Sequence, residues 1–97
     1  MIRHCVTLTF SSDATAEQVH AVLDGLATLP GAIPEIRSYS FGRDLALAEG
    51  NASMVVVGDF DDVAGYLVYR DHPAHQKVIV EAIRPILAGR SAVQYEH

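Results

Sequence analysis

A short segment near residue 70 gathers the side chains best suited to acid–base chemistry. The run Tyr69-Arg70-Asp71-His72-Pro73-Ala74-His75 contains two imidazoles and a phenol. Imidazole titrates close to neutral pH, and an imidazole or phenol held beside a substrate can move protons to and from it. His75 lies three residues before Val78 and four before Ile79, so on a helix it falls on or beside the apolar face. We therefore expect His75 to point beneath its helix.

His4, near the N-terminus, is also expected to point into the interior. Residues 2–10 alternate between apolar and polar side chains, which predicts a half-buried strand with His4 on its apolar face. His4, Tyr69 and His75 facing one apolar pocket would form an acid–base site. The structural alternative is that His4 is a hydrogen-bonded core residue, that His72 caps a helix, and that Tyr69 only packs its ring.

Other kinds of site find less support in the residue pattern. His72 and His75 have a spacing that metal sites use, but no third ligand is close in sequence, so we expect no metal. Cys5 alternates away from His4, which argues against a nucleophilic Cys–His pair. The segment 42–44 lacks phosphate-loop spacing, and no dinucleotide fingerprint exists, so no cofactor is expected.

Composition narrows the class of protein. The 97 residues favour one domain over 1–97, and twelve acidic against seven basic residues give a net charge of −5. The cationic residues are scattered, which argues against nucleic acid as a partner. No apolar run is long enough for a bilayer, so no membrane association is expected. A single cysteine and the lack of a signal-peptide pattern predict a cytoplasmic protein with a reduced thiol.

The elements that must position these side chains can be followed along the chain. Thr15 and Gln18 have capping-box spacing and predict a helix ended by Pro30-Gly31. Strands are predicted over 36–41 and 53–60, separated by a loop over 42–51. The apolar face of the first helix repeats with helical spacing and consists of Val19, Val22, Leu23, Leu26 and Leu29.

Two further helices and a last strand complete the predicted fold. Asp61 and Asp62 favour a helix over 63–70. Pro73 suits the first turn of another helix. Pro85 lies late in that helix and should kink it or start its end, and Gly89 is expected to close it. Residues 91–95 form the last strand. The order β-α-β-β-α(α)-β predicts an α+β, ferredoxin-like fold, a four-stranded antiparallel sheet with helices on one face.

One face of this sheet has no element to cover it. On the first strand that face carries Cys5, Thr7 and Thr9, and both faces of the strand over 53–60 are partly apolar. Exposed apolar surface of this kind usually marks an interface. We therefore expect a homodimer in which two sheets pack face to face and close into a barrel.

The sequence resembles the stress-responsive dimeric α/β-barrel (Dabb) domain family over essentially its whole length. The resemblance rests on Ile2-Arg3-His4, on Ile36-Arg37-Ser38 with Gly42-Arg43-Asp44, and on His72-Pro73-Ala74-His75 followed by Arg84-Pro85. It implies a ferredoxin-like protomer and a homodimeric barrel. Most members of the family have no assigned reaction, and some are very stable, stress-induced proteins.

The resemblance also implies candidate roles. A plant cyclase of the family closes a poly-β-ketone thioester by an aldol condensation without a cofactor, and its catalytic histidine and tyrosine look like His75 and Tyr69. A further pocket histidine of that enzyme looks like His4. Two positions depart from it, because Met54 stands where it has a histidine and Leu26 where it has a tyrosine. A more apolar pocket of different shape is expected.

The sequence supports two functions. The first is binding of a small apolar or carbonyl ligand between helices and sheet, with no reaction assigned. The alternative is a cofactor-free acid–base enzyme, either polyketide cyclase-like or a cofactor-independent monooxygenase. There His75 would take a proton from a carbon between two carbonyls, Tyr69 would bind the carbonyl oxygen or hold His75 in its tautomer, and His4 would orient the substrate. The expected pocket walls are Leu23, Leu26, Met54, Ile79 and Ile83.

Overall fold

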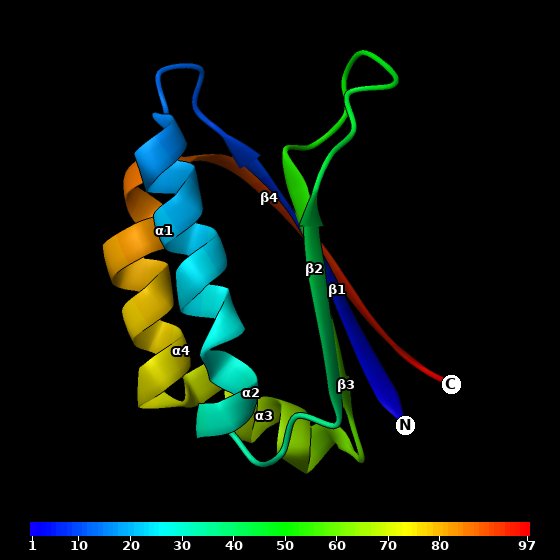
Figure 1. The fold of residues 1–97 in the computed structure, drawn as a ribbon. Helices are drawn as coiled ribbons and strands as arrows, with labels where there is room; N and C mark the ends of the chain where they lie inside the picture. The colour runs from blue at the N-terminus through cyan, green and yellow to red at the C-terminus, as the bar shows by residue number, and fades with distance from the viewer.

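Four antiparallel strands form one sheet, and all helices lie on one of its faces (Figure 1). The computed structural model describes residues 1–97. The strands are β1 Ile2–Phe10, β2 Ser38–Arg43, β3 Met54–Phe60 and β4 Leu87–Glu96, in the order β2-β3-β1-β4. This is the ferredoxin-like arrangement, so the predicted fold class is confirmed.

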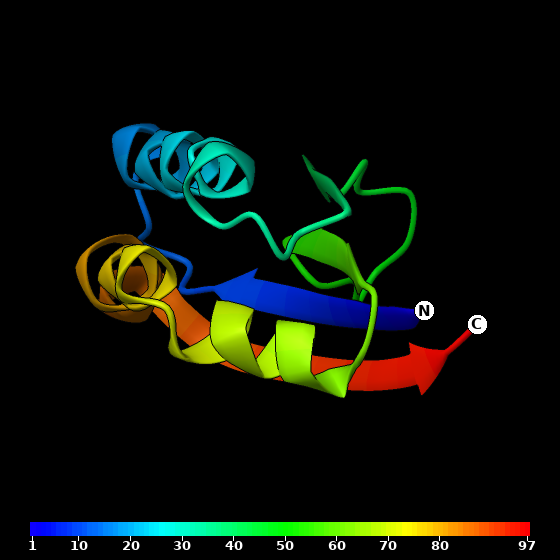
Figure 2. The ribbon, with the colours of Figure 1, turned by 90° about the horizontal axis from the view of Figure 1, so that it is seen from below.

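The helical layer consists of four α-helices and two short irregular helical turns. Figure 2 shows helix α1 (Ala16–Ala27) and helix α4 (Pro73–Val78) nearly end on and adjacent, on the same side of the sheet. None of the helices has the length and apolarity needed to cross a lipid bilayer. The helices are α1 Ala16–Ala27, α2 Leu29–Ala32, α3 Val63–Asp71 and α4 Pro73–Val78, followed by a π-helical turn η1 Ile79–Ile83 and a 3₁₀ turn η2 Arg84–Ile86.

The start of α1 is as predicted, but its end is not. Thr15 Oγ1 accepts from the Gln18 amide at 3.1 Å and Gln18 Oε1 accepts from the Thr15 amide at 2.9 Å, which completes the capping box. The helix ends at Ala27, before the predicted Pro30-Gly31 stop. Pro30 instead occupies the first turn of α2, where its missing N–H costs no hydrogen bond.

Two strand boundaries differ from the prediction because pairing partners decide them. β2 runs over Ser38–Arg43, shifted from 36–41, since Gly42 and Arg43 pair with β3 in the hairpin. β4 starts at Leu87, so the prediction that Gly89 closes the preceding helix is wrong. Gly89 and the residues after it pair with β1 along nearly its whole length.

Pro85 ends the last helix, as predicted. A proline cannot donate to the carbonyl four residues back, and its ring clashes with that carbonyl. The helix widens before Pro85, and the amide of Arg84 donates to the carbonyl of Ile79, five residues back. One 3₁₀ turn then leads into β4. This irregular segment carries several residues of the site described below.

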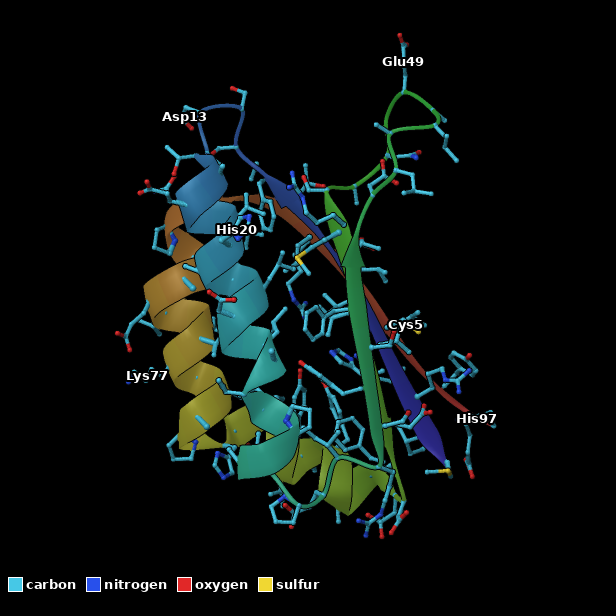
Figure 3. All side chains as sticks on the ribbon, in the orientation of Figure 1. Cys5, Asp13, His20, Glu49, Lys77 and His97 are labelled. Atoms are coloured by element: carbon cyan, nitrogen blue, oxygen red, sulfur yellow. The ribbon has the colours of Figure 1, made fainter.

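The two faces of the sheet differ sharply. Val6, Leu8, Val56 and Phe60 point to the helices and form the core with Leu26 and other apolar helix residues. The opposite face is bare, and Figure 3 shows Cys5 on that side, away from the helices. Exposed apolar side chains on this open face, Val55, Val93 and Tyr95, are 39%, 56% and 44% exposed.

Candidate functional site

A cavity of about 330 Å³ opens between the helices and the sheet. Side chains from β1, β3, β4, α1, α3, α4 and the η1 and η2 turns surround it. Six of the side chains expected from the sequence line it, namely His4, Leu26, Tyr69, His75, Ile79 and Ile83. Leu23 and Met54 do not line it, because Leu23 packs at the margin of the core and Met54 lies within the core.

His75 is placed by a short helix with a histidine cap. α4 begins at Pro73, and the Nδ1 of His72 accepts from the amide of Ala74 at 3.0 Å. The predicted capping role of His72 is confirmed. With its start fixed in this way, α4 turns His75 toward the cavity and against the end of α3.

The tautomer of His75 follows from its backbone contact. Its Nδ1 lies 3.0 Å from the carbonyl oxygen of Arg70, so Nδ1 carries the proton and donates it. The Nε2 therefore holds a lone pair, and it has no partner within the protein. No buried side-chain nitrogen or oxygen lacks a partner, so this Nε2 is accessible. Burial lowers the pKa of His75, which keeps the ring neutral and able to accept a proton at pH 7.

Tyr69 lies between the two histidines. Its ring stacks on His75, with centroids 4.1 Å apart and planes 26° apart, and lies 6.0 Å from the ring of His4. Its hydroxyl is 2.8 Å from that of Tyr39, which has no other partner. Tyr39 can therefore donate to Tyr69 and leave the Tyr69 proton free for a ligand. Burial raises the pKa of Tyr69 to about 12, so the phenol stays protonated.

His4 has the opposite tautomer to His75. The amide nitrogen of Gln94 donates to its Nδ1 at 2.8 Å, which places the proton of His4 on Nε2. This Nε2 has no partner in the protein, and because no buried side-chain nitrogen is unpaired, it is open to the cavity that His4 lines. Burial, helped by the charge of Arg90, lowers the pKa of His4 to about 4. His4 is a neutral hydrogen-bond donor.

Together these groups supply complementary chemistry in an apolar space. His75 offers a lone pair, whereas His4 and Tyr69 offer an N–H and an O–H. The tautomer of His75 is fixed by the carbonyl of Arg70 and not by Tyr69, which stacks on the ring. Two donors can hold a carbonyl oxygen while a neutral imidazole accepts a proton nearby. No three His, Cys, Asp or Glu side chains are grouped so as to hold a metal ion.

Sequence reasoning missed several residues of the site. Tyr66 lies one helical turn before Tyr69 and 5.0 Å from the His4 ring, and this three-residue spacing was a usable signal. Tyr39 and Gln94 contact the site from strands far away in sequence. Three arginines also line the cavity: Arg70, Arg84 and Arg90. Nothing in their sequence spacing groups these arginines, because they come from three different elements.

The fold and the sequence both identify the class of protein. The protomer is ferredoxin-like, with a cavity beneath the helices. Residues 2–97 match the stress responsive A/B barrel domain (Dabb), and the chain belongs to that family. No curated protein matches the chain significantly.

Solved structures resemble it closely. A dimeric ferredoxin-like protein of unknown function from Thermobifida fusca is 43% identical, with a TM-score of 0.91 over 99% of this chain and 90% of that one. A hydroxynitrile lyase from Passiflora edulis is 19% identical, with a TM-score of 0.84 over 97% and 90%. An antibiotic biosynthesis monooxygenase is 11% identical, with a TM-score of 0.80 over 100% and 98%. The last two share the fold alone.

Proposed function

We propose that this Dabb domain binds a small, mainly apolar carbonyl or acyl compound in the cavity between helices and sheet. The observation that carries the proposal is that the free acceptor on His75 and the free donor on His4 line one cavity of about 330 Å³ together with Tyr69, whose hydroxyl can donate to a ligand when Tyr39 donates to it. Cavities of this size, mostly apolar and with a few convergent polar groups, are typical ligand sites.

The apolar part of the cavity supports an acyl chain as ligand. Leu26, Ile79 and Ile83 line it opposite the sheet residues Val6 and Val56. Transfer of methylene groups from water to such walls contributes about 0.8 kcal/mol for each group buried. The polar end of the ligand would then lie at the three free hydrogen-bonding groups, because unpaired polar groups are costly away from water.

Octanamide tests this proposal, since it joins an acyl chain to a neutral carbonyl and an amide donor. We expect calorimetry to detect binding, and His4→Phe to weaken it about tenfold through the lost donor. His20→Phe is the matched control, because His20 is exposed on α1. Octanamide that fails to bind, or that binds equally to the parent and to His4→Phe, would contradict this role of the cavity.

A second candidate function, acid–base catalysis, is favoured by the neutral ring and accessible Nε2 of His75. In the proposed step a C–H bond between two carbonyls breaks, its proton passes to Nε2, and its electron pair moves to a carbonyl oxygen. The hydroxyl of Tyr69 and the N–H of His4 would hold that oxygen as it becomes negative. Addition of this enolate to a second carbonyl carbon would be a cyclase-like aldol step. No contact in the cavity favours monooxygenase chemistry.

We also infer a homodimer formed through the open sheet face. Val55 and Val93 are exposed there in the protomer, and Cys5 on β1 lies directly opposite Val93 of β4 on the same face. The 43% identical T. fusca protein is described as dimeric. A reduced thiol buried at such an interface fits the cytoplasmic location predicted from the sequence.

A charge on the open face should separate the protomers. We expect Val55→Lys to sediment as a monomer at concentrations at which the parent is a dimer, because the lysine would lose its hydration in the interface. Val80→Lys is the matched control, since Val80 is 49% exposed on η1, on the helical side. A parent protein that sediments as a monomer, or dissociation by both variants alike, would contradict the proposed interface.

A further inference from the structure

The cavity has a charge opposite to that of the molecule. The chain carries a net charge of −5 and seven cationic residues, yet three of these, Arg70, Arg84 and Arg90, line this one cavity. No aspartate or glutamate lines it. A cavity lined by one sign of charge attracts ligands of the other sign, and low-dielectric walls strengthen that attraction.

Ion pairing separates these arginines into two kinds. Arg70 pairs with its neighbour Asp71 at 2.9 Å. Arg84 and Arg90 have no carboxylate within 4.0 Å, although acidic residues outnumber basic ones in this chain. Both are exposed, so their guanidinium groups keep free donors for a ligand at the rim of the cavity. A guanidinium binds carboxylate and phosphate oxygens with two parallel hydrogen bonds.

The two free arginines border the cavity from different directions. Arg84 opens the η2 turn at the end of the last helix, whereas Arg90 lies on β4 opposite Leu8. The charge of Arg90 also reaches the interior, since it adds to the lowering of the pKa values of His4 and His75 and opposes the rise that burial causes in the pKa of Tyr69. An anion at the rim would therefore lie close to the carbonyl-binding groups.

We propose that the cavity selects anionic ligands, namely acyl or carbonyl compounds that carry a carboxylate or a phosphate group bound by Arg84 and Arg90. This inference rests on the proposed function, which supplies the acyl chain and the carbonyl contacts. It adds a substrate class to that function, and it assigns these two arginines as specificity-determining residues. The apolar walls of the cavity would contact the acyl chain of the ligand, and the two arginines at the rim would bind its anionic group.

Three probes with one chain length separate the two proposals. Octanamide is neutral, octanoate carries a carboxylate, and octyl phosphate carries a phosphate. At pH 7 and low salt we expect at least one of the anions to bind at least tenfold more tightly than octanamide. The tighter anion identifies the headgroup class. The anion preference should shrink as salt is raised, because exposed charges are screened.

Substitution of the arginines gives the decisive comparison. In Arg84→Gln/Arg90→Gln the preference for the anion over octanamide should fall at least tenfold, whereas Arg43→Gln/Lys77→Gln, which removes two cations elsewhere, should keep it. If octanamide binds and the anions bind no better, or if the preference survives the first double variant, this inference is overturned while the proposed function stands. If octanamide fails to bind, the proposed function is contradicted, and this inference, which rests on it, is overturned with it. The salt dependence of the parent protein decides the matter should that variant fail to fold.

Discussion

Replacement of His75 with alanine is expected to slow proton exchange on a β-keto compound by about 10²- to 10⁴-fold, the usual contribution of a general base. The physical reason is that burial keeps His75 neutral, and that its Nδ1 carries the proton donated to the carbonyl of Arg70, which leaves Nε2 as the accessible basic nitrogen of the cavity. Deuterium uptake from D₂O at the carbon between the carbonyls of ethyl 3-oxooctanoate, followed by mass spectrometry, measures this exchange.

The variant should still fold. His75 is half-buried, and alanine suits the interior of α4, so the lost contacts are one hydrogen bond and the stacking on Tyr69. His20→Ala removes an exposed imidazole from α1 and should exchange at the parental rate. Equal exchange by His75→Ala and the parent would exclude His75 as the base. Exchange by the parent no faster than in buffer would exclude catalysis and leave ligand binding as the function.

The second large effect concerns pH. Burial lowers the pKa of His4 from 6.5 to about 4, so the unfolded chain binds a proton between these values that the folded protein does not. The contribution of neutral His4 to the free energy of unfolding is therefore fully present above pH 6.5, and it is lost as the pH drops toward 4. The expected loss from His4 is about 3 kcal/mol. The pKa of His75 is also lowered by burial, and it acts in the same direction.

Urea unfolding at pH 7, 5.5 and 4, at one protein concentration, measures this loss. His4→Phe should show a smaller loss over the same interval, because phenylalanine does not titrate. Asp59 titrates outside this pH interval, because hydrogen bonds from Arg3 hold its pKa well below 3.8. The contribution of Asp59 to folding stability is therefore lost only at lower pH. A parent protein as stable at pH 4 as at pH 7 would contradict the buried, neutral state of His4.

Local signals in the sequence predicted much of the fold and the centre of the site. Alternation over residues 2–10 placed His4 on the helical face, and helical spacing placed His75 above the cavity. The capping box at Thr15 and the break at Pro85 are likewise set by neighbours in the chain. These features depend on residues within one turn or one strand, which is why they can be read without the tertiary structure.

Features that depend on distant partners could not be predicted. The tautomers of both histidines are set by the carbonyl of Arg70 and the amide of Gln94, and the second of these reaches His4 across the β1–β4 register. Tyr39 contacts Tyr69 from β2, an edge strand whose register the sequence leaves open. Arg90 reaches the cavity because β4 begins earlier than the predicted residue 91.

A crystal structure of the protein with octanamide tests most directly whether the cavity is a carbonyl-binding site. The predicted result is an acyl chain against Leu26 and Ile83, with the carbonyl oxygen within hydrogen-bond distance of His4 Nε2 or the Tyr69 hydroxyl. The amide nitrogen should donate to Nε2 of His75. Octanamide bound only outside this cavity, or bound in it without contact to any of the three polar side chains, would contradict the proposal.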